Sequence, residues 1–205
     1  MSSDSVVAVT AQTDGEPVET PRNRRQEETF RKVLAAGVEM LRESSYADLT
    51  VRSVAARAKV APATAYTYFS SKNHLIAEVY LDLVRQVPYF TDVNDSMTTR
   101  VDKAVRALTL VVADEPEVAA ACTTALLGGG SDPAVRTVRD RIGAEIHKRI
   151  RSAVGPDADP RIVSALEMTF FGALVNAGSG AFTYHQIADR LTYVVGLLLG
   201  EDKTA

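Results

Sequence analysis

The sequence has few of the side chains that cross-link a chain or bind metals. It contains one cysteine, Cys122, and three histidines among 205 residues. A single cysteine cannot form an intrachain disulfide, and nothing in the sequence resembles a zinc ligand set. An enzyme would need converging nucleophiles, acids or metal ligands, which three scattered histidines and one cysteine in an apolar segment do not supply. We therefore expect no enzyme, no metal site and no cofactor, and a reducing compartment.

Long hydrophobic runs are also missing. The longest late apolar stretch, residues 194–199, is far too short to cross a bilayer, which takes about 20 apolar residues. Near the start, the apolar run at residues 6–9 follows no basic residue and is too short for the core of a signal peptide. We therefore expect a cytoplasmic protein with no membrane partner.

Excess positive charge is confined to one part of the chain. Residues 1–21 carry four acids and no base, residues 22–78 carry ten bases and six acids, and residues 79–205 carry thirteen bases and sixteen acids. A basic module within an otherwise acidic protein is typical of a chain that meets phosphates with one part of its surface. We expect residues 1–21, which have few large apolar groups, to be a disordered leader. Residues 22–78 and 79–205 are then two successive domains.

Apolar residues recur at helical spacing from Arg24 onward, and no stretch alternates like a strand, so we expect an all-α fold of about nine helices. The first ends near Ser44. A second begins after Thr50 as its N-cap, and a third begins at Pro62, whose fixed φ suits the first position of a helix. The short connection between them makes a helix-turn-helix. Further helices are expected at 72–86, 97–113, 115–127, 133–154, 160–178 and 184–199.

The short third helix has one buried face and one exposed face. At about 100° per residue, Ala65 and Phe69 point into the core. The opposite side carries small residues flanked by two tyrosines: Ala63, Thr64, Thr67, Tyr66 and Tyr68. Such a helix can enter the major groove of DNA while each tyrosine reaches one sugar–phosphate wall.

Residues 25–75 resemble the DNA-binding domain of the tetracycline-repressor (TetR/AcrR-type) family of transcriptional regulators. The resemblance rests on LTVRSVA at 49–55 and ATAYTYFSSK at 63–72. It implies that Thr50, Tyr66, Tyr68 and Lys72 bind phosphates and that Arg52, Pro62, Ala63 and Thr64 lie near base edges. Of these, Arg52 could pair with guanine O6 and N7. Two positions depart from the family pattern: Lys59 stands where glycine is common, and Ala61 where a capping serine is common.

The resemblance also implies that the last two helices pair with their two-fold mates in a homodimer. The residues expected at this interface are Phe170, Leu174, Ala177, Leu191, Val195 and Leu198. The middle helices would hold a mostly apolar effector pocket. Its candidate lining is Phe90, Met97, Leu108, Cys122, Leu126, Met168 and Phe171. For both groups, ordinary packing within the chain is the alternative interpretation.

We therefore expect a ligand-responsive transcriptional repressor whose dimer binds a near-palindromic DNA operator and is released by a small apolar or amphipathic effector. An activator or a global DNA-binding regulator is an alternative within the same class. A helical protein-interaction module is an alternative from another class, since exposed Tyr66 and Tyr68 could contact a protein. Binding to duplex DNA that falls steeply with salt would separate these classes.

Overall fold

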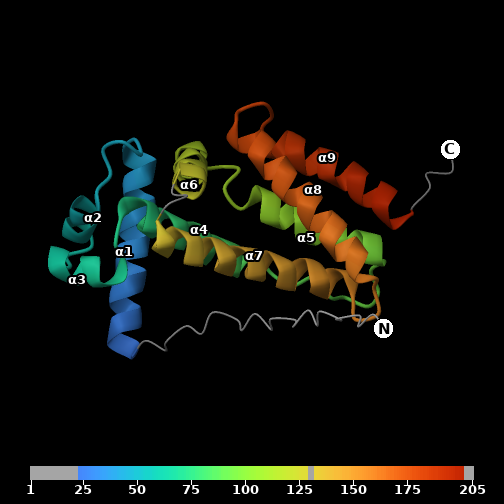
Figure 1. Cartoon of the computed structure of the whole chain (residues 1–205), viewed down its shortest axis with the longest axis horizontal. Coiled ribbons are helices and arrows are strands. Elements are labelled where there is room, and N and C mark those ends of the chain that lie inside the picture. Colours follow the sequence, from blue (N-terminus) through green and yellow to red (C-terminus); the bar gives the residue numbers. More distant parts are fainter. Residues whose placement is uncertain (1–22, 129–131, 201–205) are drawn as a thin grey trace, which may run out of the picture.

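The computed structural model describes residues 23–128 and 132–200. In these two ranges the regular structure consists of nine α-helices and no strand (Figure 1), as the sequence predicts. The helices are α1 Arg24–Glu43, α2 Val51–Arg57, α3 Pro62–Tyr68, α4 Lys72–Gln86, α5 Met97–Leu110, α6 Pro116–Gly128, α7 Pro133–Val154, α8 Pro160–Gly178 and α9 Tyr184–Leu199. The predicted leader, residues 1–21, lies outside the described residues. Among the helices described, none combines the length and the hydropathy that crossing a bilayer requires.

Helices α1, α2 and α3 form a small group at one end of the molecule (Figure 1). Helix α1 begins with a reciprocal cap in which the Gln26 amide N–H donates to Asn23 Oδ1 and the Asn23 amide N–H donates to Gln26 Oε1, both at 2.9 Å. Its buried face carries Phe30, which stacks on Phe69 with ring centroids 5.0 Å apart. This stacking ties the end of α3 to α1 and so sets the position of the short helix.

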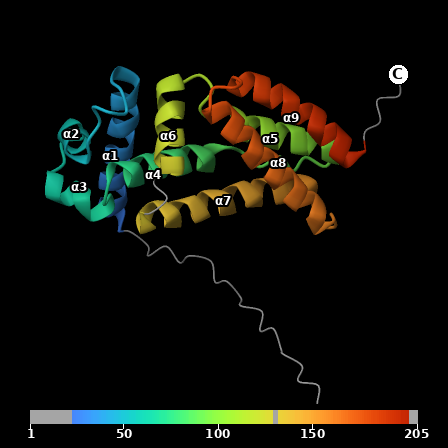
Figure 2. The same ribbon diagram turned by 45° about the horizontal axis from the view of Figure 1, so that its top comes forward.

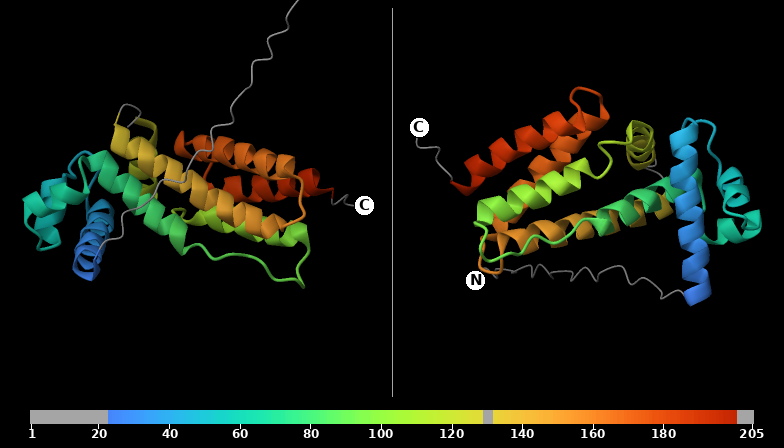
Figure 3. Two further views of the ribbon diagram at one scale, coloured as in Figure 1. Left: turned by 60° about the horizontal axis from the view of Figure 1, so that its bottom comes forward. Right: turned by 180° about the vertical axis from the view of Figure 1, so that it is seen from behind.

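The six remaining helices form the larger body. Helix α5 packs along α9, and α7 packs along α4 (Figure 3). Helix α6 lies between α1 and the pair α8 and α9 (Figure 2). Helix α4 is buried continuously from Leu75 to Leu81, so it is the shared central element of the small group and the body. The domain boundary expected after residue 78 falls inside this helix.

Most of the residues expected at a dimer interface lie in the core of the chain itself. Phe170, Ala177, Leu191 and Val195 are buried, because α8 and α9 pack against each other and α9 packs against α5. In the single chain these four residues pack inside the core, and Leu198 alone of the six is exposed, so their place at a dimer interface stays a prediction. The apolar side chains that α8 and α9 leave exposed are Met168, Phe171, Val175, Tyr193, Leu197 and Leu198.

Candidate DNA-binding interface and effector cavity

The start of α2 is held by a reciprocal cap between Thr50 and Ser53. The Ser53 amide N–H donates to Thr50 Oγ1, and the Thr50 amide N–H donates to Ser53 Oγ, both at 3.0 Å. This capping box is hard to recognise in the sequence, because its third helical position holds serine instead of the more usual glutamate or glutamine. Arg52 lies in the same turn, is exposed, and makes no side-chain hydrogen bond or ion pair with the described residues. Its guanidinium is therefore free to reach a base.

The turn between α2 and α3 has a left-handed residue at Lys59, with φ of 54°. A β-carbon is disfavoured in that conformation, which is why glycine suits the position. The next amide N–H, that of Val60, donates to the Ala55 carbonyl at 2.9 Å and closes the turn. Ala61 gives α3 no side-chain cap, as its residue type predicts, and Pro62 occupies the first helical position.

Helix α3 has the two faces that the helical wheel predicts. Ala65 and Phe69 are fully buried, whereas Tyr66 is 51% exposed. Pro62, Ala63, Thr64 and Thr67 are also exposed. Tyr68 is half-buried, with its ring edge-on to Phe30 at a centroid distance of 6.1 Å. The exposed face of α3 thus carries small side chains, with one exposed and one half-buried tyrosine at its sides.

Lys72 is less exposed than a phosphate-binding surface lysine would be. Its ammonium donates to the Tyr46 carbonyl at 2.9 Å and lies 4.1 Å from the centroid of the Tyr46 ring. The Tyr46 hydroxyl in turn donates to Asn73 Oδ1. Lysine has three donors, so N–H groups remain for a phosphate. Tyr46 and Asn73 were not predicted from the sequence, although Tyr46 stands out there as a single aromatic residue between the first two helices.

Comparison with known proteins agrees with this geometry. Residues 33–79 match the model of the bacterial regulatory proteins of the tetR family. HTH-type transcriptional regulators of Mycobacterium tuberculosis and Mycobacterium bovis are 74% identical to the chain, over 97% of its length and 94% of theirs. The chain belongs to the TetR family. It is a helix-turn-helix transcriptional regulator, and the family resemblance predicted from residues 49–72 is confirmed.

Solved structures of TetR-family regulators share the fold. A TetR transcriptional regulator from Rhodococcus sp. RHA1 superimposes with a TM-score of 0.71 at 21% identity, covering 86% of this chain and 98% of the other. A TetR-family regulator from Streptomyces coelicolor has a TM-score of 0.60 at 14% identity, covering 85% of this chain and 81% of the other. Both support the assignment of the whole chain to one architecture.

The body of this TetR-family regulator contains a cavity of about 260 Å³, lined by residues of α4, α6, α7, α8 and α9 and by Val112. Three of the predicted pocket residues line it: Cys122, Leu126 and Phe171. Leu174, which was expected at the dimer interface, lines it as well.

Four predicted pocket residues do not line this cavity. Leu108 is buried in the core that α5 forms with its neighbours, and Phe90 and Met97 are half-buried against that core. Met168 lies on the outer face of α8 and is 73% exposed. Apolar character alone does not indicate which side of a helix faces a cavity, so the lining of this cavity does not support these four predictions.

The cavity lining is mainly apolar, with a few polar groups. Burial raises the pKa of the Cys122 thiol to about 12 and also raises the pKa values of the Tyr80 and Tyr184 phenols. These groups are therefore neutral at physiological pH. Arg139 is the one charged residue among those that line the cavity.

Two side-chain contacts join the cavity walls to the DNA-binding end of this regulator. Asp132, the N-cap of α7, accepts a hydrogen bond from the Ser71 hydroxyl, the N-cap of α4, at 2.8 Å. Further along the same helices, Arg141 Nη1 lies 2.6 Å from Glu78 Oε1. Helices α4 and α7 are thus linked twice, and α4 begins at the proposed phosphate contact.

Proposed function

We propose that the protein is a transcriptional repressor whose dimer binds a near-palindromic operator and is released by a small apolar or amphipathic effector. The observation that carries this proposal is that one helix serves both sites. Tyr80 of α4 lines the cavity, and Lys72 begins the same helix beside α3. The two residues are about 12 Å apart along the helix axis, so a rigid shift of α4 reaches both.

On DNA, α3 enters the major groove with its small exposed residues facing the bases. Tyr66 and Tyr68 contact the backbone on either side, and Lys72 adds an ammonium to a phosphate. Arg52 supplies the hydrogen-bonded base contact, because its guanidinium has no partner within the described residues and matches guanine O6 and N7. This arrangement favours a DNA partner over a protein partner, as do the names of the mycobacterial relatives.

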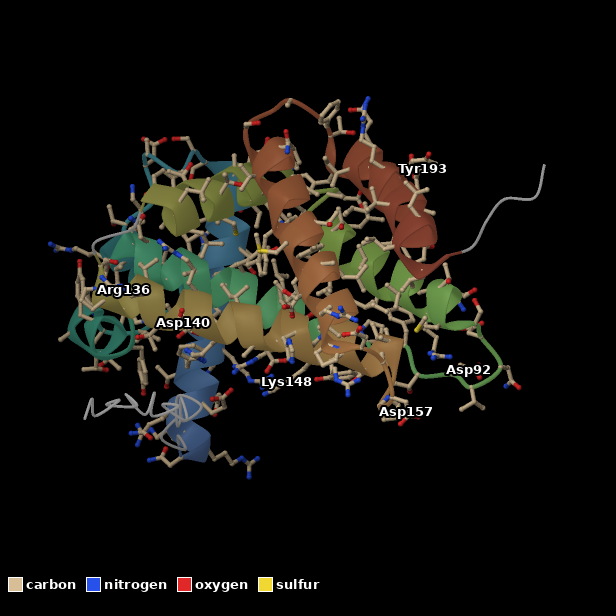
Figure 4. The ribbon with its side chains drawn as sticks, turned by 45° about the vertical axis from the view of Figure 1, so that its right-hand side comes forward. Asp92, Arg136, Asp140, Lys148, Asp157 and Tyr193 are labelled. Atoms are coloured by element: carbon tan, nitrogen blue, oxygen red, sulfur yellow. The ribbon has the colours of Figure 1, made fainter. Side chains whose placement is uncertain are left out.

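The dimer forms through the exposed apolar side chains of α8 and α9. Met168, Tyr193 and Leu197 are 73%, 63% and 64% exposed, and Tyr193 projects from the outer side of α9 (Figure 4). Apolar groups gathered on one face of a protein mark an interaction surface. A two-fold axis through this surface presents two copies of α3 to successive major grooves in the cytoplasm, where the operator is.

Release follows when the effector favours a conformation in which the two copies of α3 no longer match the DNA. Only a difference in affinity between the two conformations can shift the equilibrium. A tenfold loss of operator affinity requires about 1.4 kcal/mol of coupling, and the operator must weaken effector binding by the same factor. The contacts that carry this coupling are Ser71 with Asp132 and Glu78 with Arg141.

The DNA-binding part is tested by gel-shift titration on the DNA upstream of the protein's own gene. Arg52→Ala should flatten the preference at one base position in each half-site, by about 1–3 kcal/mol. Tyr66→Phe should weaken binding evenly at all sequences, because it removes a backbone contact. The matched control is Tyr89→Phe, since Tyr89 is 49% exposed and lies outside the small group of α1, α2 and α3.

Two outcomes would contradict the docking. One is equal affinity of the Tyr66 variant, the Tyr89 variant and the unmutated protein. The other is an affinity for duplex DNA that does not fall with salt, since phosphate contacts release counterions. Either result would favour the protein-interaction alternative.

A further inference from the structure

Arg139 brings a charge to the cavity wall, and none of the residues that the structure describes pairs with it. The residue is half-buried on α7 and lines the cavity. Its Nε and Nη2 atoms are inaccessible to solvent and make no hydrogen bond with residues 23–128 or 132–200. Leaving buried donors of a charged group unpaired is costly, so this arrangement needs an explanation.

Arg149, two to three turns further along the same helix, shows how this chain satisfies a buried arginine. Its Nε donates to the Val87 carbonyl at 2.9 Å, and its Nη2 donates to the Arg85 carbonyl at 2.8 Å. Its Nη1 lies 2.6 Å from Glu145 Oε2. All three nitrogens of Arg149 are therefore used within the protein. The contrast indicates that Arg139 is kept for a partner from outside the chain.

The two unpaired atoms of Arg139 suggest the chemistry of that partner. Nε and Nη2 form one edge of the guanidinium, whose parallel N–H groups match the two oxygens of a carboxylate. No acid lines the cavity. The remaining polar lining consists of neutral groups such as Thr123 and Tyr184, and the rest is apolar, including Leu126, Ile142 and Phe171. A ligand complementary to this lining has one anionic head and an apolar body.

We propose that the cavity binds an amphipathic carboxylate whose head group draws the Nε and Nη2 edge of Arg139 out of the cavity wall and pairs with it, while its apolar part lies between α6 and α8. The volume of about 260 Å³ lies just below the range of about 300–1,000 Å³ common for small-molecule sites, which favours a compact or medium-length ligand. The inference rests on the proposed function only in treating this cavity as the effector site.

The position of Arg139 also connects the head group to the DNA-binding end. Arg139 lies two turns after Asp132 on α7, and Asp132 accepts the hydrogen bond from Ser71 at the start of α4. A carboxylate that draws Arg139 toward the cavity pulls on the helix whose N-cap holds α4. The charged head group, rather than the apolar body, is then the part of the ligand that alters operator affinity.

The test is calorimetric titration of the full-length protein with decanoate and with decan-1-ol, two probes of equal chain length that differ in head-group charge. Decanoate should bind the unmutated protein about tenfold or more tightly than decan-1-ol, as expected for hydrogen bonds to charged groups. Arg139→Met should remove that advantage, so that decanoate no longer binds more tightly than decan-1-ol. Arg136→Met is the matched control, because Arg136 is an exposed arginine of α7 (Figure 4), and it should behave like the unmutated protein.

The comparison of probes on the unmutated protein decides the inference even where Arg139→Met does not fold. Equal affinities for the two probes, or no binding of decanoate, would overturn it, and so would a folded Arg139→Met that retains the decanoate advantage. A gel shift with operator DNA separates this inference from the proposed function. Decanoate that binds through Arg139 but leaves the DNA complex intact supports the carboxylate site and contradicts its role in induction.

Discussion

The ion pair between Glu78 and Arg141 offers the most direct test of how α4 and α7 are joined. The side chains are 4% and 12% exposed, and Arg141 Nη1 lies 2.6 Å from Glu78 Oε1. Removing Glu78 takes away the counter-charge 2.6 Å from Arg141, although Glu145 still interacts with it, and the loss of one partner of a buried pair typically destabilises a protein by about 3–5 kcal/mol. We therefore expect Glu78→Gln to lower the free energy of unfolding by this amount, even though glutamine has nearly the same shape.

Thermal unfolding followed by circular dichroism measures the effect. For a chain of this size each kcal/mol shifts Tm by roughly 2–4 °C, so Glu78→Gln should lower Tm by roughly 6–20 °C. Protein concentration must be held constant, because the unfolding of a dimer depends on it. The control is Glu28→Gln. It removes a pair with Lys32 that has a similar length, 2.8 Å, but side chains 63% and 59% exposed, so Tm should not change.

A double variant separates the loss of an interaction from the burial of a lone charge. Replacing Glu78 with leucine and Arg141 with methionine together should recover most of the stability that Glu78→Gln loses, because no buried charge is left. The same variant should bind the operator but respond less to an effector, since one of the two links between α4 and α7 is gone. A Tm of Glu78→Gln equal to that of the unmutated protein would refute the reasoning, as would a double variant no more stable than the single one.

Three further predictions concern separate features. Lys59→Gly should raise the free energy of unfolding by up to about 1 kcal/mol in urea titration, because φ at this residue is 54° and glycine relieves the left-handed strain. An unchanged free energy of unfolding would contradict this. Leu197→Glu should convert the dimer into monomer in light scattering, since Leu197 is 64% exposed on α9; a monomeric unmutated protein would refute the proposed interface. Arg42→Met should be less stable than the unmutated protein at pH 7 but equally stable in acid. Arg42 lies 2.6 Å from Glu115 and lowers the pKa of that carboxyl. The stabilisation from this ion pair is therefore present above about pH 4.3 and is lost as pH falls through the lowered pKa. Stability curves of the two proteins that stay parallel below that pH would exclude this ion pair as the cause.

Helix starts were predicted well from the sequence because they depend on local chemistry. Pro133 and Pro160 each follow an aspartate that caps the helix, and both helices begin at the proline. The end of α5 was predicted three residues too late. Residues 111–114 form a turn, but Val112 is still buried, so the apolar periodicity continues past the last helical residue. The spacing of apolar residues indicates which side chains are buried, and here the buried residues continue beyond the end of the helix.

The DNA-binding residues and the cavity differ in how far sequence can predict them. The proposed DNA contacts lie within residues 50–72, where the geometry of two short helices and one turn decides which side chains share a face. The cavity depends on how five helices pack, which no local pattern contains. Helix α8 illustrates this: Phe170 is fully buried, its neighbour Phe171 lines the cavity, and Met168 is exposed. All three are apolar, so the sequence could not assign them to core, cavity and outer face.

The burial of α4 limits how a signal can travel from the cavity to the DNA. Because the helix is buried continuously from Leu75 to Leu81, local bending would open the core, and the proposed release therefore requires α4 to shift as a rigid body together with α7. Helix α1 is tied to the body through the pair between Arg42 and Glu115, whose side chains are 55% and 33% exposed. An exposed pair of this kind contributes little to stability and therefore opposes such a shift only weakly. In the proposed release, the buried contacts of α4 with α7 would therefore carry the motion, while the weak surface contact of α1 would let the DNA-binding end move with them.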